Sequence, residues 1–315
     1  MSAPAAASGR TPGGQLRRVL LLVPCGLAML MGVDAALALL GLPAPLSGDR
    51  LTSGHGMLMV IGFVGALIAL ERSAAIGRWW AHAAPVCMAL GPLLTLVGPL
   101  PVRAGRAVMV AGCLVLCVDY VVLWSRNREP LVAVQIGGGI SALCGTIVWL
   151  GGAAVPSLVP FLIPFLVLTV IAERLDLSRI GQLAWTPGRR RRHEDSLVLL
   201  SALSVLAGPA AMARPTIGLP AHGLVLIALA AQSASGDVAR RGVRAAGPHR
   251  FTALMILAGY GWLVVTGLLL LRPALSGLHY DATLHAVFLG FVLSMIAAHA
   301  STILPTLLGV RMRFV

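Results

Sequence analysis

Lysine is absent from the 315-residue sequence, and charged and aromatic residues are scarce. All 24 basic residues are therefore arginine; charged residues make up 11% of the chain and aromatic residues 5%. Hydrophobic residues make up 58%, and the mean hydropathy of +0.90 lies outside the range of soluble globular proteins. Apolar runs of about 20 residues, the length of a transmembrane helix, recur along the whole chain. The sequence therefore predicts an integral membrane protein without a separate soluble domain.

The sequence also lacks any Cys-x-x-Cys motif, which leaves zinc and iron–sulfur sites with little support. The five cysteines all fall within apolar runs, where a thiol usually serves as a small buried hydrophobe. They are Cys25, Cys87, Cys113, Cys117 and Cys144. The high isoelectric point of 11.3 is attributed to arginines that anchor loops at the membrane surface, so no nucleic-acid partner is expected.

Ten apolar segments are predicted to cross the lipid bilayer as helices, which makes the fold an all-α polytopic membrane bundle. They cover residues 18–42, 55–71, 80–100, 105–125, 130–152, 155–173, 196–213, 217–236, 251–271 and 282–308. Residues 1–15 are small and polar, and we expect them to form a disordered cytoplasmic tail before a single transmembrane domain over residues 16–315. The Gly/Pro-rich stretch "GGAAVPSLVP" separates the fifth span from the sixth.

The distribution of arginine orients these spans. If both termini are cytoplasmic, 19 of the 24 arginines lie on the cytoplasmic side and five lie outside, as the positive-inside rule requires. We therefore expect a multi-pass protein of the bacterial cytoplasmic (inner) membrane. The longest loop, residues 174–195 with "GRRRRHED", is then cytoplasmic. Because spans two, eight and ten start outside, His55, His222 and His285 stand at the outer ends of three helices.

Three stretches of the chain align without gaps and indicate an internal repeat. They are "GFVGALIALERS" from Gly62, "PFLVLTVIAERL" from Pro164 and "GFVLSMIAAHAS" from Gly290. Each has Phe at its second position and a polar residue at its tenth: Glu71, Glu173 and His299. The stretches lie in spans two, six and ten, four spans apart, which predicts a pseudo-threefold arrangement of four-helix units.

Ionisable residues inside the spans are functional candidates, because burying them in hydrocarbon is costly. The candidates are Asp34, Glu71, Asp119, Glu173, His285 and His299. In "ER" at 71–72 and at 173–174, the simpler interpretation is that the arginine extends to the inner surface and the glutamate pairs locally. The alternative is a proton path that uses Glu71, Glu173 and Asp34.

His55 and His285 each head a helix that runs from outside to inside, so they are expected at similar depth. Two such imidazoles can ligate one haem iron from opposite faces, and bis-histidine ligation serves electron transfer because it leaves no open position. The small residues Gly56 and Gly290 provide the clearance that a flat macrocycle needs. The alternative interpretation is that each histidine merely caps and hydrates its helix.

The remaining histidines offer further metal ligands. His222, in "PAHGLVLIAL", repeats the His-Gly entry of span two and is either a third ligand or a surface cap. His299 lies on the same face of span ten as His285, about 21 Å away along the helix, so it would serve a second site or a proton route. Copper is a second candidate ion, because imidazole and thioether groups suit it and methionines follow His55.

Two motifs resemble subunit I of the haem–copper oxidases. "SGHGMLMVIGF" at 53–63 resembles the family's second helix, and "LHAVFLGFVLSMIAAHA" at 284–300 resembles its tenth; together these carry the axial histidines of the low-spin haem. The length of the chain and the residues at the start of span two are also similar to those of NnrS, a haem- and copper-associated membrane family linked to nitric oxide metabolism. The resemblance implies a low-spin haem b ligated by His55 and His285.

The sequence departs from the oxidase pattern in its middle. The predicted sixth and seventh spans contain no histidine, and the His-Pro-Glu-x-Tyr motif is absent, so no binuclear oxygen-reducing centre is expected. Three functions stay open at this point. The first is a haem protein that transfers electrons, or that acts in the metabolism or sensing of a small gas such as nitric oxide, with a redox protein or respiratory subunit as partner. The second is a transporter of copper or another small solute. The third is a structural subunit of a respiratory complex.

Overall fold

The computed structural model describes residues 12–46, 48–97, 101–272 and 275–299, and every regular element within these ranges is helical. Ten of the described helices are long and apolar enough to cross a membrane. The prediction of an all-α bundle with ten spans is therefore confirmed. These helices identify the chain as a multi-pass membrane protein that contacts the lipid bilayer.

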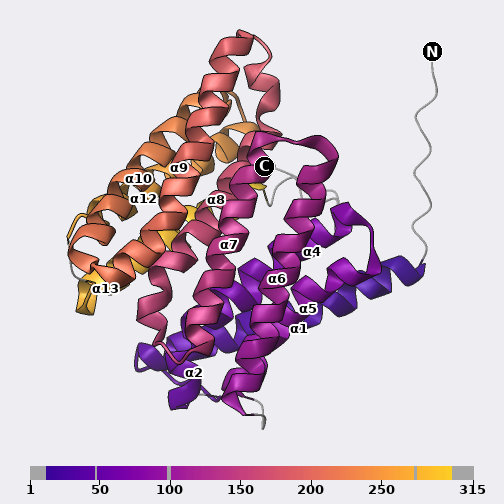
Figure 1. Ribbon diagram of the computed structural model, residues 1–315, viewed down its shortest axis with the longest axis vertical. Helices are drawn as coiled ribbons and strands as arrows, with labels where there is room; N and C mark the ends of the chain where they lie inside the picture. Colours follow the sequence, from indigo (N-terminus) through magenta and orange to yellow (C-terminus); the bar gives the residue numbers. More distant parts are fainter. Residues whose placement is uncertain (1–11, 47, 98–100, 273–274, 300–315) are drawn as a thin grey trace. The chain divides into compact units, whose positions relative to one another are not determined.

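Contacts between residues divide the chain into two compact units, residues 1–115 and 116–315. The first unit contains α1 (Pro12–Leu39), α2 (Asp49–Ser53), α3 (His55–Met57), the π-helical η1 (Leu58–Gly65), α4 (Ala66–Ile76), η2 (Trp79–His82), α5 (Ala83–Leu96) and the first half of α6 (Val102–Asn127). Segments α3, η1 and α4 form one continuous span, His55–Ile76, and the next residue, Gly77, caps it with a left-handed backbone (φ +71°) that suits a glycine. This span packs against α1 and α5, drawn in indigo and purple in Figure 1.

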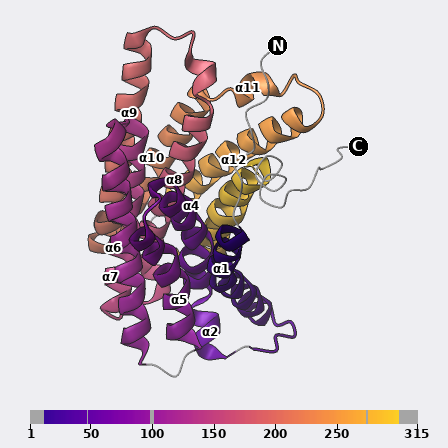
Figure 2. The same ribbon diagram turned by 90° about the vertical axis from the view of Figure 1, so that its right-hand side faces the viewer.

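The second unit contains the rest of α6, α7 (Pro130–Leu150), η3 (Val155–Leu158), α8 (Val159–Leu177), η4 (Arg179–Gln182), α9 (Pro187–Ala213), α10 (Pro215–Gly236), α11 (Ala239–Gly242), α12 (Pro248–Leu270), α13 (Gly277–His285) and the π-helical η5 (Ala286–Leu293). Four of these helices begin with proline, whose fixed φ and missing N–H suit the first turn. Helix α8 is buried along most of its length, and α10 packs between α9 and α12 (Figure 2).

Two predicted boundaries need correction. Residues 174–195 are not an open loop: α8 continues to Leu177, and α9 begins at Pro187, so the arginine-rich stretch forms the first turns of α9. The hydroxyl of Thr186 caps this helix by accepting a hydrogen bond from the backbone N–H of Arg189. At the N-terminus, α1 begins at Pro12, so residues 12–15 of the expected tail are helical. Residues 1–11 and 300–308 lie outside the described residues.

Spans two and ten each contain an eight-residue π-helical segment, η1 and η5. Such segments are rare and occur often at functional sites. In the alignment that pairs Gly62 with Gly290, η1 and η5 begin at the same position and end at the same position. In span six, the equivalent residues 160–167 are α-helical. The local backbone thus agrees with the repeat for spans two and ten, while the threefold arrangement stays a prediction.

Candidate functional site

His55 is half-buried at the start of span two, in the first unit. Its Nδ1 donates a hydrogen bond to the backbone carbonyl of Gly32 in α1, at 2.8 Å. A carbonyl oxygen can only accept, so this bond requires the proton on Nδ1. In the neutral imidazole the lone pair is then on Nε2, which is the atom that ligates a metal when Nδ1 is held by a backbone carbonyl.

His285 has the same ring arrangement in the second unit. It is the last residue of α13, immediately before η5, and its side chain is exposed. Its Nδ1 donates to the carbonyl of Asp281, one turn earlier, at 2.7 Å. The proton is again on Nδ1, and the lone pair of the neutral ring is on Nε2. Both predicted ligands therefore present the same nitrogen for coordination.

The two glycines that were expected to provide clearance differ in their surroundings. Gly56 directly follows His55 and is half-buried. Gly290 packs against the indole of Trp262 in α12, and a Cβ at this position would lie 2.5 Å from that ring. The open face expected at Gly290 is therefore filled in this structure, and a ligand there would require the partly exposed Trp262 side chain to move.

His222 and His299 occupy different environments from the first two histidines. His222 is fully buried in α10, and its Nε2 forms a 3.1 Å hydrogen bond with the hydroxyl of Ser204 in α9. This contact ties two helices together and is not the surface cap considered for His222. His299 is half-buried, and its Nδ1 donates to the carbonyl of Met295. Among the described residues, no group of three or more His, Cys, Asp or Glu side chains is placed to hold a metal ion.

Each of the proposed proton-path residues has a polar contact, which is local in sequence only for Glu71. Glu71 is exposed and pairs with Arg72 at 2.9 Å, as the simpler interpretation expected. Glu173 accepts a hydrogen bond from the amide of Gln135 in α7. Asp34 is buried in α1, and its carboxylate accepts a hydrogen bond from the backbone N–H of Leu46. The contact from Leu46 ties the segment after α1 back to that helix.

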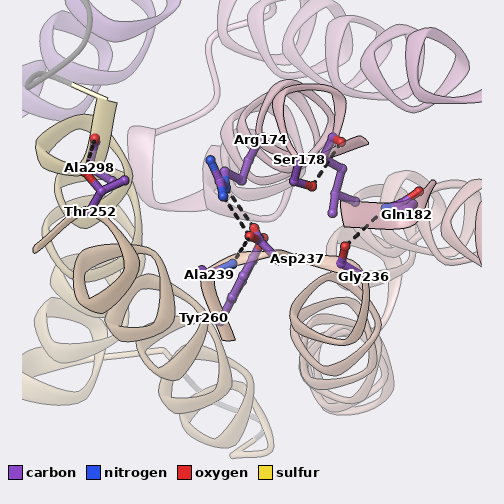
Figure 3. Close-up of polar contacts among 10 residues, drawn as sticks. Arg174, Ser178, Gln182, Gly236, Asp237, Ala239, Thr252, Tyr260 and Ala298 are labelled. Atoms are coloured by element: carbon purple, nitrogen blue, oxygen red, sulfur yellow. Dashed lines mark hydrogen bonds and ion pairs between the residues drawn. The ribbon is translucent and has the colours of Figure 1, made fainter. Parts of the chain in front are cut away.

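Arg174 does not extend to the surface, so the simpler interpretation is wrong for this residue. Its guanidinium forms a bidentate pair with the carboxylate of Asp237, through Nε (2.8 Å) and Nη2 (2.7 Å), and both side chains are buried (Figure 3). Asp237 also accepts hydrogen bonds from the hydroxyl of Tyr260 at 2.9 Å and the backbone N–H of Ala239 at 2.8 Å. This cluster joins the end of α8 to α12 and to the segment after α10, and the sequence offered no motif for it.

Two more polar groups in the second unit stand out. Asp119 in α6 is fully buried, and within the described ranges neither carboxylate oxygen has a hydrogen-bond partner. An apolar span makes such a carboxyl group a functional candidate. At the surface, Arg179 pairs with Glu129 at 2.7 Å, and this hydrogen bond raises the pKa of Arg179 above its ordinary value.

These features define a multi-pass α-helical membrane protein with π-helical turns beside two of its histidines. The chain belongs to the family described as domain of unknown function DUF8744, whose model matches residues 18–315. Comparisons with curated proteins and with solved structures find no match.

Proposed function

We propose that this protein binds a low-spin haem b in the membrane, with His55 and His285 as axial ligands. The observation that carries the proposal is the hydrogen bond from Nδ1 of each imidazole to a backbone carbonyl. Such a bond fixes the tautomer and the ring orientation and raises the basicity of the other nitrogen. It is the usual arrangement around a metal-ligating histidine, and His55 forms it with a carbonyl of another helix, α1.

The π-helical segments give independent support. Segment η1 begins three residues after His55, and η5 begins directly after His285. Because a π-helical turn contains more residues than an α-helical turn, it changes the direction of the side chains that follow. A π turn beside each ligand would let the helix orient the residues below the imidazole without moving the imidazole itself.

The role of the bound group follows from its ligands. Held by His55 and His285, the haem would supply electron transfer, because bis-histidine ligation leaves no coordination position open to substrate. The residues of this chain would hold the group, orient it and exclude water from it. We propose that the protein transfers electrons to or from a redox protein or respiratory subunit, or acts in nitric oxide or other small-gas metabolism or sensing, as the resemblance implies.

The arginine distribution extends the proposal to location. Arg189 to Arg192 fall in the first turns of α9, and Arg240 and Arg241 form half of the four-residue α11. Under the positive-inside rule both segments face the cytoplasm. We propose that the protein lies in the bacterial cytoplasmic (inner) membrane with both termini cytoplasmic, so that His55 and His285 approach the outer surface.

The test is an optical spectrum of the purified protein, oxidised and reduced, with metal analysis and carbon monoxide binding. The wild type should contain haem with a low-spin b-type spectrum and should bind carbon monoxide poorly. His55→Ala and His285→Ala should each open one axial position, so that carbon monoxide binds. His82→Ala is the matched control, because the Nδ1 of His82 also donates to the carbonyl one turn earlier, that of Arg78.

His82→Ala should keep the wild-type spectrum. His222→Ala should also have little effect, because its Nε2 contacts Ser204. A wild type that contains no haem after expression with added haem precursor would contradict the proposal. So would an unchanged low-spin spectrum in both the His55 and His285 variants. Copper in place of iron would favour the transporter alternative.

A further inference from the structure

A polar cavity of about 210 Å³ lies between the first turns of α9 and the last turns of α10. It is lined by Trp185, Arg189, Arg192, His193, Gln232 and Ser235. Its volume is roughly seven times that of a water molecule in the liquid. The lining combines two guanidinium groups with an indole, an imidazole, an amide and a hydroxyl, and it contains no carboxylate.

The cavity lies beyond the hydrocarbon part of α9. That helix has 27 residues, so it is about 40 Å long, whereas the hydrocarbon core of a bilayer is about 30 Å thick. The apolar residues of α9 begin after Asp195, and every cavity residue of α9 comes before that position. The cavity is therefore at the level of the lipid headgroups, where tryptophan and arginine are commonly found.

The two arginines of the cavity are not neutralised by nearby acids. Their neighbours have partners: Arg191 is 3.8 Å from Asp195, and Arg190 donates to the carbonyl of Gln182. In the part of the chain that the structure describes, Arg189 and Arg192 pair with no carboxylate. The guanidinium of Arg189 instead stacks on the ring of Trp185, 4.4 Å from its centroid.

The walls of the cavity are held in place by hydrogen bonds between the two helices. The Nε2 of His193 donates to the carbonyl of Gln232 at 3.0 Å, and the side-chain amide of Gln232 bonds to the hydroxyl of Ser196. Trp185 packs edge-on against His193, with ring centroids 5.1 Å apart. Ser235 donates to the carbonyl of Gln232 at 2.7 Å. These contacts fix the neutral wall of the cavity, and Arg189 and Arg192 extend beside it as exposed side chains.

We propose that this cavity binds a phosphate group, as carried by an anionic phospholipid. Guanidinium groups recognise phosphate oxygens through charge-assisted hydrogen bonds. Basic pockets between transmembrane helices bind anionic lipid headgroups in this way. The proposal does not depend on haem binding, because none of the cavity residues belongs to the histidine sites.

The experiment is native mass spectrometry of the purified protein from nanodiscs that contain phosphatidylglycerol in phosphatidylcholine, with inorganic phosphate in a separate arm. The double variant Arg189→Gln/Arg192→Gln removes both guanidinium groups. Because both guanidinium groups would bond directly to the phosphate in the cavity, losing the two should weaken binding about 30-fold. Ser235→Trp fills the cavity without changing its charge and should weaken binding as well.

The matched control is Arg240→Gln/Arg241→Gln, which removes the same charge from exposed positions in α11. It should retain the wild-type amount of phosphatidylglycerol. Retained phosphatidylglycerol without phosphate binding identifies a lipid as the source, and binding of inorganic phosphate identifies a free anion; both support a phosphate site. Equal loss in the control and cavity variants, or no loss in the cavity variants, would overturn the proposal.

Discussion

Replacement of Asp237 by alanine should be among the most destabilising single changes in the second unit. Asp237 is fully buried, and it accepts four hydrogen bonds from three groups: the guanidinium of Arg174, the hydroxyl of Tyr260 and the backbone N–H of Ala239. Alanine would leave the Arg174 guanidinium, which is 9% exposed, as an uncompensated buried charge. Breaking a buried ion pair in this way costs about 3–5 kcal/mol.

Other variants of the same cluster separate its contributions. Tyr260→Phe removes one hydrogen bond to a charged group and should cost about 1.5–3 kcal/mol. Asp237→Leu combined with Arg174→Met removes both charges, and it should recover at least half of the loss, because apolar replacement of a whole buried pair is often close to neutral. Asp195→Ala is the control: its partner Arg191 is 3.8 Å away, both side chains are exposed, and the cost should be about 0.5 kcal/mol or less.

The free energy of unfolding can be measured by titrating the purified protein in mixed detergent micelles with a denaturing detergent and following tryptophan fluorescence. The reasoning depends on the burial of the charge that remains, not on the number of hydrogen bonds. If Asp237→Ala costs no more than Asp195→Ala, the Arg174 guanidinium must find another partner or reach water. The ion pair would then not be what holds α8 to the segment after α10.

Two further predictions concern helix packing and orientation. In α12, Gly267→Ala should lower the free energy of unfolding by about 1–3 kcal/mol, because its Cβ would lie 2.6 Å from the carbonyl oxygen of Gly223 in α10. The control Gly261→Ala should be neutral or slightly stabilising, because a Cβ there would meet nothing within 4 Å. Equal effects of the two variants would contradict the close approach of α12 to α10. Reporter fusions at residues 182–192 and 242–248 should report cytoplasm, and fusions at 46–50 and 274–278 should report the outside. An outside signal from the arginine-rich start of α9 would reverse the orientation.

The number and type of the spans could be predicted because hydrocarbon length and hydropathy determine them together. The start of α9 was misplaced because residues 187–195 are polar, and hydropathy reports where a helix is apolar, not where it begins. The cues were present: Thr186 and Pro187 form a cap and a first-turn proline. If these two signals had been given more weight than the polarity of residues 187–195, the start of α9 would have been predicted correctly.

The polar contacts could not be predicted in the same way. Arg174 and Asp237 are far apart in the sequence, and only the folded chain brings the two side chains together. The "ER" pairs at 71–72 and 173–174 look equivalent in the sequence, yet Arg72 pairs with the adjacent Glu71 and Arg174 pairs with a distant aspartate. Which acid lies opposite an arginine depends on tertiary packing, so composition and spacing could not distinguish the two cases.

The π-helical segments bear on how the two candidate ligands are related. The alignment that superimposes η1 on η5 places His55 opposite Thr283 and His285 opposite Met57, so the two histidines are two positions apart in the repeat. Two positions on a helix point to different faces. Under this alignment the two histidines are not equivalent positions, so the repeat does not support a paired role for them. The hydrogen bonds of the two rings therefore have to be compared individually: His55 bonds to a carbonyl of another helix, α1, whereas His285 bonds within α13. The His55 arrangement requires tertiary structure to form, so His55→Ala is the more informative of the two variants.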